Sequence, residues 1–167
     1  MPNSPSFTAS DPEFAARIRA SFARQGAMSL IGAQIQQVQA GRVLIALPHQ
    51  AAISQQHGFV HAGIVATALD SACGYAAATL MPADAGVLTI EFKINLLAPA
   101  RGPWIWLEGQ VTKAGRSISV ADGRAYEAGA PSASSAPGAA ALPEQHKLIA
   151  TLTATLMTVT GRDDVRH

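Results

Sequence analysis

Hydrophobic residues recur along the chain with two different periods, and these periods predict where helices and strands lie. Near the N-terminus, apolar residues at helical spacing predict an amphipathic helix from Ser10 to Gly26: Phe14, Ile18 and Phe22. Ser10 and Glu13 have the spacing of a capping box that would start this helix. The alternation in residues 31–48 then predicts two strands joined at residues 40–41.

The longest apolar stretch lies in the middle of the chain, from Ala62 to about Met81, and Pro82 follows it. A run of this length without an internal proline favours a helix over a strand. Alanines occur on several faces of this helix. It is therefore predicted to be buried on all sides, with side chains small enough for a sheet to come close. A single carboxylate, Asp70, interrupts the apolar run.

Strand patterns fill most of the remaining chain, in residues 87–100, 103–115, 117–127 and 147–161. Residues 128–146 are rich in Pro, Ala, Ser and Gly and predict a flexible insert, dispensable for folding, between the last two strands. Residues 1–9 and 162–167 predict flexible tails. This order of elements predicts a single α+β domain over residues 1–167, with antiparallel strands wrapped around one central helix.

The composition of the chain excludes several classes of function. Hydrophobic residues make up 49% of the chain and charged residues 14%, as in a folded globular protein. The net charge of +1 provides no basis for binding nucleic acid or an anionic membrane surface. A single cysteine, Cys73, excludes an internal disulfide and a multi-cysteine metal site. No signal peptide and no apolar run of roughly 18 residues is present, so a cytoplasmic location is expected.

A resemblance to a known family begins at the entry to the central helix. HGFVHAGIVATALDSACGYAA, followed by TIEFKINLLAPARG and TKAGRSISVADGRAYE, resembles the hotdog-fold acyl-CoA thioesterases of the phenylacetate-pathway (PaaI-like) family. In that family Asn or Gln precedes Gly by three residues, His-Gly-Gly follows three residues later, and an acidic residue ends the pattern. The matching residues here are Gln55, Gly58, His61-Ala62-Gly63 and Asp70. Ala62 thus replaces the first glycine of the family pattern.

The resemblance covers about residues 27–161 and implies a hotdog fold and an acyl-CoA thioesterase. Such an enzyme would hydrolyse an aryl- or medium-chain acyl-CoA to the free acid and CoA. It would need no metal ion and no cofactor beyond the CoA of its substrate. Asp70 would be the nucleophile or general base. Thr89 stands where the family often has a hydroxyl group that orients the attacking water.

The other expected site residues lie at the start of the central helix. A helix N-terminus has free N–H groups and a partial positive charge, so the N–H of Ala62 or Gly63 would hold the oxyanion. Gln55 would donate to the thioester oxygen or hold water, and it fits the family spacing better than Gln56. His61 would fix the entry to the helix.

Three cations near a glycine-containing turn are candidates for binding the phosphates of CoA. They are Lys113, Arg116 and Arg124. Arginine and lysine suit phosphate oxygens, and the alternative is a solvated hairpin end.

The spacing of the site residues also predicts an assembly. Asp70 lies eight residues after Ala62, which is ~12 Å along a helix. One carbonyl cannot contact both groups of a single subunit, so Asp70 is predicted to meet the helix start of a partner subunit. A two-fold dimer would contain two such shared sites. The family also implies a dimer of dimers.

Several alternatives stay open at this point. Asp70 could cap a neighbouring loop, and the chain could bind acyl-CoA without cleaving it. A hotdog hydratase or dehydratase would need a histidine five residues after the aspartate, where this chain has Tyr75. Cys73 is expected to be a small core residue. His57 and His61 have the spacing of two zinc ligands, but the sequence offers no third ligand.

Overall fold

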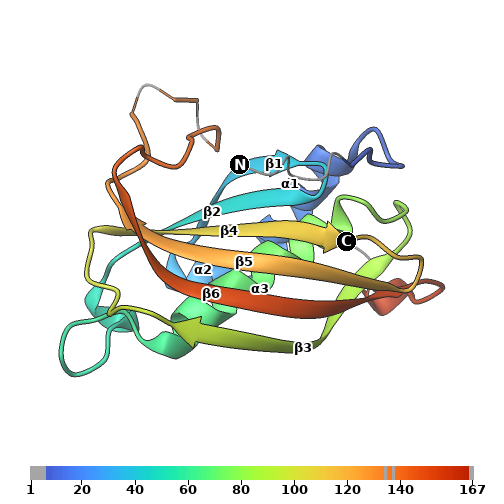
Figure 1. Cartoon of the computed structure of the whole chain (residues 1–167). Coiled ribbons are helices and arrows are strands. Elements are labelled where there is room, and N and C mark those ends of the chain that lie inside the picture. Colours follow the sequence, from blue (N-terminus) through green and yellow to red (C-terminus); the bar gives the residue numbers. More distant parts are fainter. Residues whose placement is uncertain (1–6, 134, 137, 166–167) are drawn as a thin grey trace.

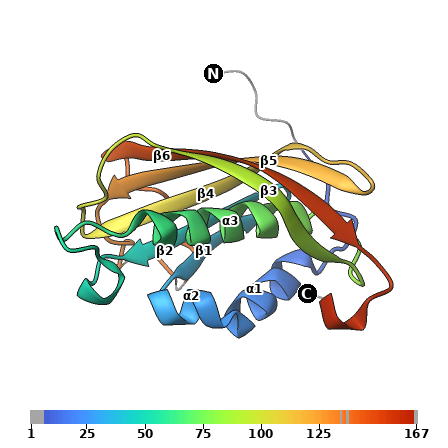
Figure 2. The ribbon, with the colours of Figure 1, turned by 90° about the horizontal axis from the view of Figure 1, so that it is seen from below.

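The long apolar stretch forms the helix around which the rest of the chain folds. The computed structural model describes residues 7–133, 135–136 and 138–165. In it, helix α3 covers Ala62–Ala78 and lies against the concave face of one antiparallel sheet (Figures 1 and 2). The helix ends three residues before the predicted Met81, because Leu80 and Met81 donate to carbonyls three residues back in a tighter turn.

Six strands form this sheet in the order β1-β2-β4-β5-β6-β3, and every neighbouring pair is antiparallel. The strands are β1 (Gln34–Gln39), β2 (Arg42–Pro48), β3 (Gly86–Leu96), β4 (Trp104–Lys113), β5 (Ile118–Ala128) and β6 (His146–Val159). Short 3₁₀ turns are η1 (Ala51–Ile53) and η2 (Asp163–Val165). One sheet curved around one long helix confirms the predicted α+β hotdog fold.

Small residues let the sheet approach the central helix closely, as predicted. Gly109 of β4 and Gly123 of β5 are register partners. A Cβ added at Gly109 would lie 2.3 Å from the carbonyl carbon of Ala72, so only glycine fits there. A Cβ added at Gly123 would lie 3.1 Å from the Cys73 sulfur. The packing therefore depends on glycine in the sheet as much as on alanine in the helix.

The N-terminal helix differs from its prediction at both ends. Helix α1 covers Phe14–Arg24, and no side chain caps its first turn. The predicted capping box is wrong, because the Asp11 carboxylate accepts the Glu13 N–H and forms an ion pair with Arg17 instead. Gly26 does not end the helical region but starts the short helix α2 (Gly26–Ile31). Figure 2 shows α1 and α2 on the far side of α3 from the sheet.

The insert between β5 and β6 contacts the outer face of the sheet. The Trp106 indole N–H donates to the Gly129 carbonyl at 2.9 Å, and Ala140 and Leu142 pack beside the ring. Trp106 is 0% exposed as a result. The composition of the insert did not predict this contact, while its flexibility stays a prediction. Residues 134 and 137 of the insert lie outside the described residues, as do residues 1–6 and 166–167 of the predicted tails.

Across the residues that the structure describes, no helix is both long enough and apolar enough to cross a membrane.

Candidate active site

The N-terminus of α3 opens into a cavity of about 480 Å³. Gln55 lines it from a tight turn in which Gly58 has φ of 80°. The Gln55 side-chain oxygen accepts the His57 N–H at 2.7 Å, which holds the amide group in this turn. Predominantly apolar residues line the cavity beyond it, among them Phe59, Val65, Leu97 and Ile149. The cavity thus combines an apolar interior with polar groups at the helix start.

His61 is the N-cap of α3, as expected for a residue that fixes the helix entry. Its Nδ1 accepts the N–H of Gly63 at 3.0 Å. This bond occupies one of the two predicted oxyanion donors. The Ala62 N–H has no acceptor among the described residues, and Ala62 lines the cavity. Ala62 therefore presents the N–H group that is available to a ligand.

Asp70 and Thr89 meet between α3 and β3. The Thr89 hydroxyl donates to Asp70 Oδ1 at 2.7 Å, although 19 residues separate the two in the sequence. Asp70 Oδ2 has no partner within the part of the chain that the structure describes. Both side chains line a second cavity, of about 290 Å³. The resemblance implied both residues, and the structure places them in one hydrogen-bonded pair.

The two halves of the predicted site lie apart in one chain. Gln55, His61 and Ala62 line the first cavity, Asp70 and Thr89 line the second, and the two linings share no residue. Helix geometry puts Asp70 ~12 Å beyond Ala62 along the helix axis. A single chain therefore does not bring all predicted site residues around one thioester.

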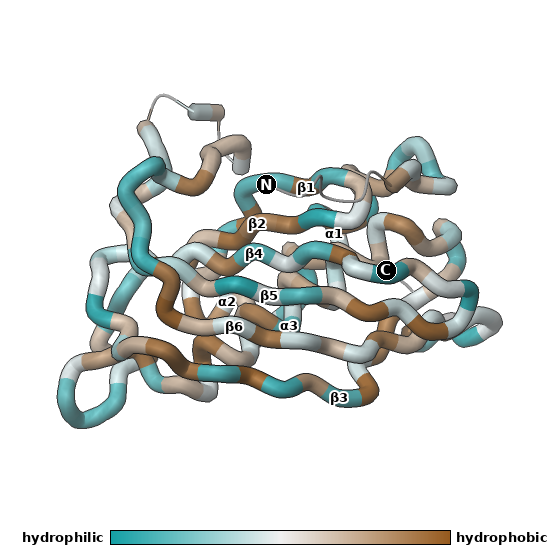
Figure 3. Tube along the Cα trace, viewed as in Figure 1, coloured by the Kyte–Doolittle hydropathy of each residue, from teal (hydrophilic) through white to brown (hydrophobic). Residues whose placement is uncertain are grey.

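A partly exposed surface surrounds Asp70. On α3, Gly63 and Thr67 are exposed and Asp70 is half-buried, at helical spacing. The prediction that this helix is buried on all sides is therefore wrong for one stripe, because the sheet and the N-terminal helices leave that side of α3 open. Strand β3, which carries Thr89, pairs with β6 alone among the described residues, so its other edge is free within that part of the chain. Hydrophobic positions recur along β3 (Figure 3), and four large ones are exposed: Leu88, Ile90, Phe92 and Leu96.

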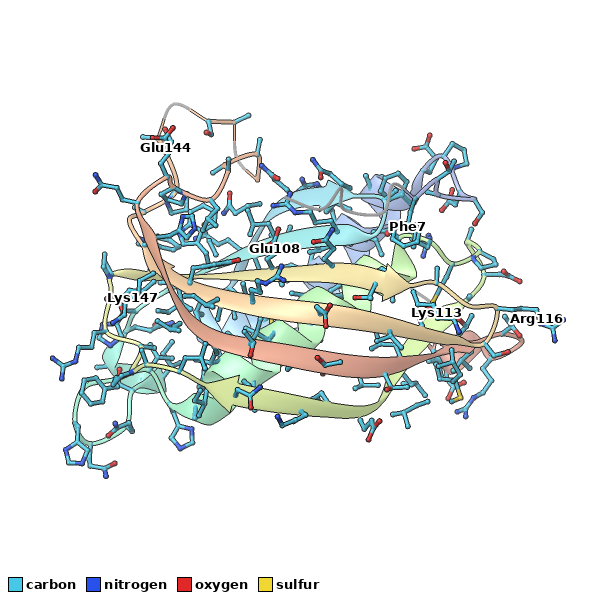
Figure 4. The ribbon with its side chains drawn as sticks, in the orientation of Figure 1. Phe7, Glu108, Lys113, Arg116, Glu144 and Lys147 are labelled. Atoms are coloured by element: carbon cyan, nitrogen blue, oxygen red, sulfur yellow. The ribbon has the colours of Figure 1, made fainter. Side chains whose placement is uncertain are left out.

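The cationic candidates divide into two groups. Lys113 and Arg116 are exposed at the hairpin between β4 and β5, at one end of the sheet (Figure 4). Arg124 is also exposed but pairs in register with Glu108, over the middle of the outer face. It lies four residues along β5 from the register partner of Lys113, which is ~13 Å. The structure thus does not bring Arg124 to the hairpin.

Cys73 is buried in the core between α3 and the sheet. Burial raises the pKa of its thiol, and the nearby charges of Asp70 and Asp122 act in the same direction. A thiol held in its protonated form is a poor nucleophile. This environment agrees with its expected role as a core residue.

The residues that share the cavity of Asp70 were missed from the sequence. They include Gln25, Ser71 and Tyr75. Ser71 and Tyr75 lie one and five residues after Asp70 on the same helix, so their closeness to Asp70 could have been predicted from the sequence. Gln25 lies 45 residues earlier, at the junction of α1 and α2, and no spacing pattern connects it with Asp70.

Comparison with known proteins identifies the family. Residues 57–131, which include Asp70 and Thr89, match the family model described as Thioesterase superfamily. A thioesterase family protein from Silicibacter pomeroyi, known from its crystal structure, is 45% identical in sequence to this chain, and the two structures superpose with a TM-score of 0.77. The similarity covers 89% of this chain and 99% of that chain. The chain belongs to the thioesterase superfamily.

One further relative agrees with that assignment, and one further solved structure agrees with the fold. A protein of Halobacterium salinarum, named as a candidate esterase, is 31% identical over 113 residues, covering 65% of this chain and 74% of the relative. The PaaI protein from the phenylacetic acid degradation operon of E. coli is 16% identical, with a TM-score of 0.71 over 89% of this chain and 95% of that chain. The latter likeness is one of fold. This thioesterase is thus an enzyme that hydrolyses thioester or ester bonds.

Proposed function

We propose that this thioesterase hydrolyses an aryl- or medium-chain acyl-CoA to the free acid and CoA, in a site that two copies of the chain share. The hydrogen bond between Thr89 and Asp70 is the observation that carries the proposal. A threonine hydroxyl that donates to Oδ1 fixes the carboxylate and leaves Oδ2 as the atom that approaches substrate or water. This is the arrangement that a general base or a nucleophile requires.

In the reaction, water adds its oxygen to the acyl carbon and the bond from carbon to sulfur breaks. Asp70 either takes the proton of this water or attacks the acyl carbon first, and the proton finally reaches the sulfur of CoA. Negative charge develops on the carbonyl oxygen, where the Ala62 N–H at the positive end of α3 would stabilise it. The Gln55 amide would add a second donor. The methyl group of Ala62 narrows this approach compared with glycine but leaves its N–H in place.

The shared site is supported by the open edge of β3. An exposed, hydrophobic edge strand readily pairs with another chain, and β3 is 11 residues long. Pairing of β3 with the same strand of a second copy would cover Leu88, Ile90 and Phe92. A two-fold axis at that edge would bring the Asp70 of one copy towards the helix start of the other. The separate cavities within one chain are consistent with this arrangement.

Lys113 and Arg116 are the better candidates for the phosphates of CoA. They are exposed, of like charge and close together at one hairpin, where a phosphate would offset their repulsion. Arg124, on the outer face opposite Glu108, would contribute less.

The replacement Asp70→Asn tests the proposal directly. We expect kcat to fall by ~100-fold or more, because the amide can neither accept a proton nor attack a carbonyl. Release of the CoA thiol from a panel of aryl- and medium-chain acyl-CoAs would measure this, with circular dichroism to check the fold. Near-normal turnover by a folded Asp70→Asn enzyme would overturn the mechanism. A wild-type chain that binds the panel tightly without cleaving it would instead be a non-catalytic acyl-CoA-binding protein.

A further inference from the structure

A histidine that lines neither cavity contacts the turn that carries Gln55. The backbone of His49 extends β2 by one residue, because its N–H donates to the Pro103 carbonyl at 2.9 Å, just beyond the last register pair of β2 and β4. Its imidazole Nε2 lies 3.1 Å from the carbonyl oxygen of Gly58 and 3.0 Å from Ser54 Oγ. One ring nitrogen, fixed to the sheet, thus contacts both arms of the turn.

The two partners of this nitrogen determine where the imidazole carries its proton. A carbonyl oxygen only accepts, so Nε2 must carry a hydrogen to bond with Gly58. The Ser54 hydroxyl donates to the Gln50 carbonyl at 2.9 Å, which leaves Ser54 Oγ to accept from the same Nε2–H. The Gln50 side chain in turn donates to the Ile31 carbonyl of α2 at 2.7 Å. The sheet and α2 therefore both connect to the turn through hydrogen bonds.

The turn has few other contacts that would hold its tip. Residues 56–58 are exposed, and one bridge pair, Ser54 and Val60, closes the base of the turn. Among the described residues, no other donor bonds to the Gly58 carbonyl. Exposed loop tips with few hydrogen bonds open easily unless they are tied down. His49 supplies the side-chain bond that ties this tip to the sheet.

Gln55 depends on the same turn for its orientation. Its backbone N–H donates to the Phe59 carbonyl at 2.8 Å, and its carbonyl accepts the Gly58 N–H at 2.9 Å. Its side-chain oxygen accepts the His57 N–H. The side-chain nitrogen is left without a partner in the part of the chain that the structure describes, and Gln55 lines the cavity at the start of α3. A displacement of Gly58 would therefore displace the amide group as well.

We infer that His49 is a positioning residue for the reaction, because it holds this turn against the sheet so that the Gln55 amide meets the carbonyl oxygen of the thioester. The inference rests on the proposed function, in which Gln55 is the second donor to that oxygen. A donor aimed at developing charge contributes most when its position is fixed in advance, and a small misplacement lowers kcat. Binding of the ground state depends less on this donor, so KM should change little.

The replacement His49→Phe keeps a ring and removes its N–H. We expect kcat to fall about tenfold while KM stays within about twofold, for the acyl-CoA that the wild type cleaves best. His49→Gln places an amide nitrogen near the position of Nε2 and should restore kcat to within about threefold of the wild type. His146→Phe is the matched control and should keep the wild-type kcat. His146 also bonds to a carbonyl oxygen, that of Pro143 at 2.7 Å, but lines neither cavity.

A double-mutant cycle separates positioning from a general loss of structure. If His49 acts through Gln55, His49→Phe should lower kcat no further once Gln55→Ala has removed the amide. Equal losses in the wild-type and Gln55→Ala backgrounds would overturn the inference. An unchanged kcat in His49→Phe, or a Gln variant as impaired as the Phe variant, would overturn it too.

Two measurements without substrate separate this inference from the proposed function. Nitrogen NMR of the wild type should show the neutral His49 ring with its proton on Nε2, as the bond to Gly58 requires. Amide hydrogen exchange of residues 55–60 should be faster by about tenfold or more in His49→Phe and return to the wild-type rate in His49→Gln. A proton on Nδ1, or unchanged exchange, would overturn the role of His49 even in an active enzyme. No turnover of any acyl-CoA would instead contradict the proposed function, and the exchange rates would still decide whether His49 holds the turn.

Discussion

At the scale of single residues, two neighbours on α3 show how environment decides chemistry. Asp70 is half-buried, bonds to Thr89 and faces a cavity, whereas Cys73 is fully buried against the sheet beside Gly123. A cysteine is intrinsically the better nucleophile, but burial keeps the Cys73 thiol protonated by raising its pKa. The carboxylate is the group that can reach a substrate.

This contrast predicts the effect of replacing Cys73. Cys73→Ala should keep kcat within about twofold of the wild type, because the thiol touches no reacting atom. It should lower the free energy of unfolding by about 1 kcal/mol, since it leaves a small space in a packed core. Turnover and denaturant unfolding measure the two effects. A folded Cys73→Ala protein without turnover would show that the thiol takes part in the reaction.

Single residues also show what the sequence could predict of the site. Asp70 came from a motif with fixed spacings and Thr89 from the family resemblance, and the structure brings the two side chains together. Gln25 belongs to no motif and reaches the cavity only because the junction of α1 and α2 packs against α3 near Ser71. A contact between distant segments depends on how helices pack, and hydrophobic periodicity does not carry that information.

At the scale of elements, β3 is a second case in which hydrophobic periodicity did not predict a feature of the site. Its alternation predicted a strand, but a register shift between Thr89 and Glu91 inserts one extra residue opposite β6. Thr89 pairs with Leu156 and Phe92 with Ala154, and both partners belong to the core on the α3 side. A strict period of two would put Thr89 and Phe92 on opposite faces. The bulge therefore decides which residues of β3 face Asp70.

The insert is the element for which composition and structure predict different results. Composition predicts that replacing the 128–146 insert with a short glycine-containing turn leaves Tm within a few degrees. Because Ala128 and His146 belong to strands and Gly129 accepts the Trp106 N–H, the replacement is limited to residues 130–145. The packing over Trp106 predicts a loss of about 2–3 kcal/mol, because the indole ring would meet water. Thermal unfolding and the emission wavelength of tryptophan would measure it. An unchanged Tm and emission would show that the insert is dispensable, as composition predicts.

The same replacement should leave turnover nearly unchanged. Neither cavity is lined by any described residue of this segment, of which Ala140 and Leu142 pack on the outer face of the sheet. Loss of turnover without loss of stability would show that the insert reaches the substrate.

At the scale of the whole molecule, the order of elements was predictable and the order of strands was not. Hydrophobic periods identified the central helix and the strands, and the resemblance supplied the hotdog fold. The position of β3 at a free edge comes from the long connections of the sheet, which local patterns do not specify. A second copy of the chain could pair at that free edge and bring the two separate half-sites together, which is why the edge supports a dimer.

A mixture of two inactive variants tests the shared site. Asp70→Asn removes one half of the site, and Gln55→Ala weakens the other half. Each variant alone should be nearly inactive in its homodimer. A mixed dimer would contain one site with both defects and one site with neither.

Random mixing makes half of the dimers mixed, with one good site of two in each, so activity should return to about a quarter of the wild type per subunit. Co-expression with two different tags ensures that the subunits exchange, and native mass spectrometry counts the mixed dimers. Co-expressed Asp70→Asn with a tagged copy of itself is the control and should stay inactive. If mixed dimers form but activity stays at the level of the parents, Asp70 and Gln55 act within one chain. The ~12 Å between Asp70 and Ala62 along α3 would then have to be bridged by a movement within a single subunit.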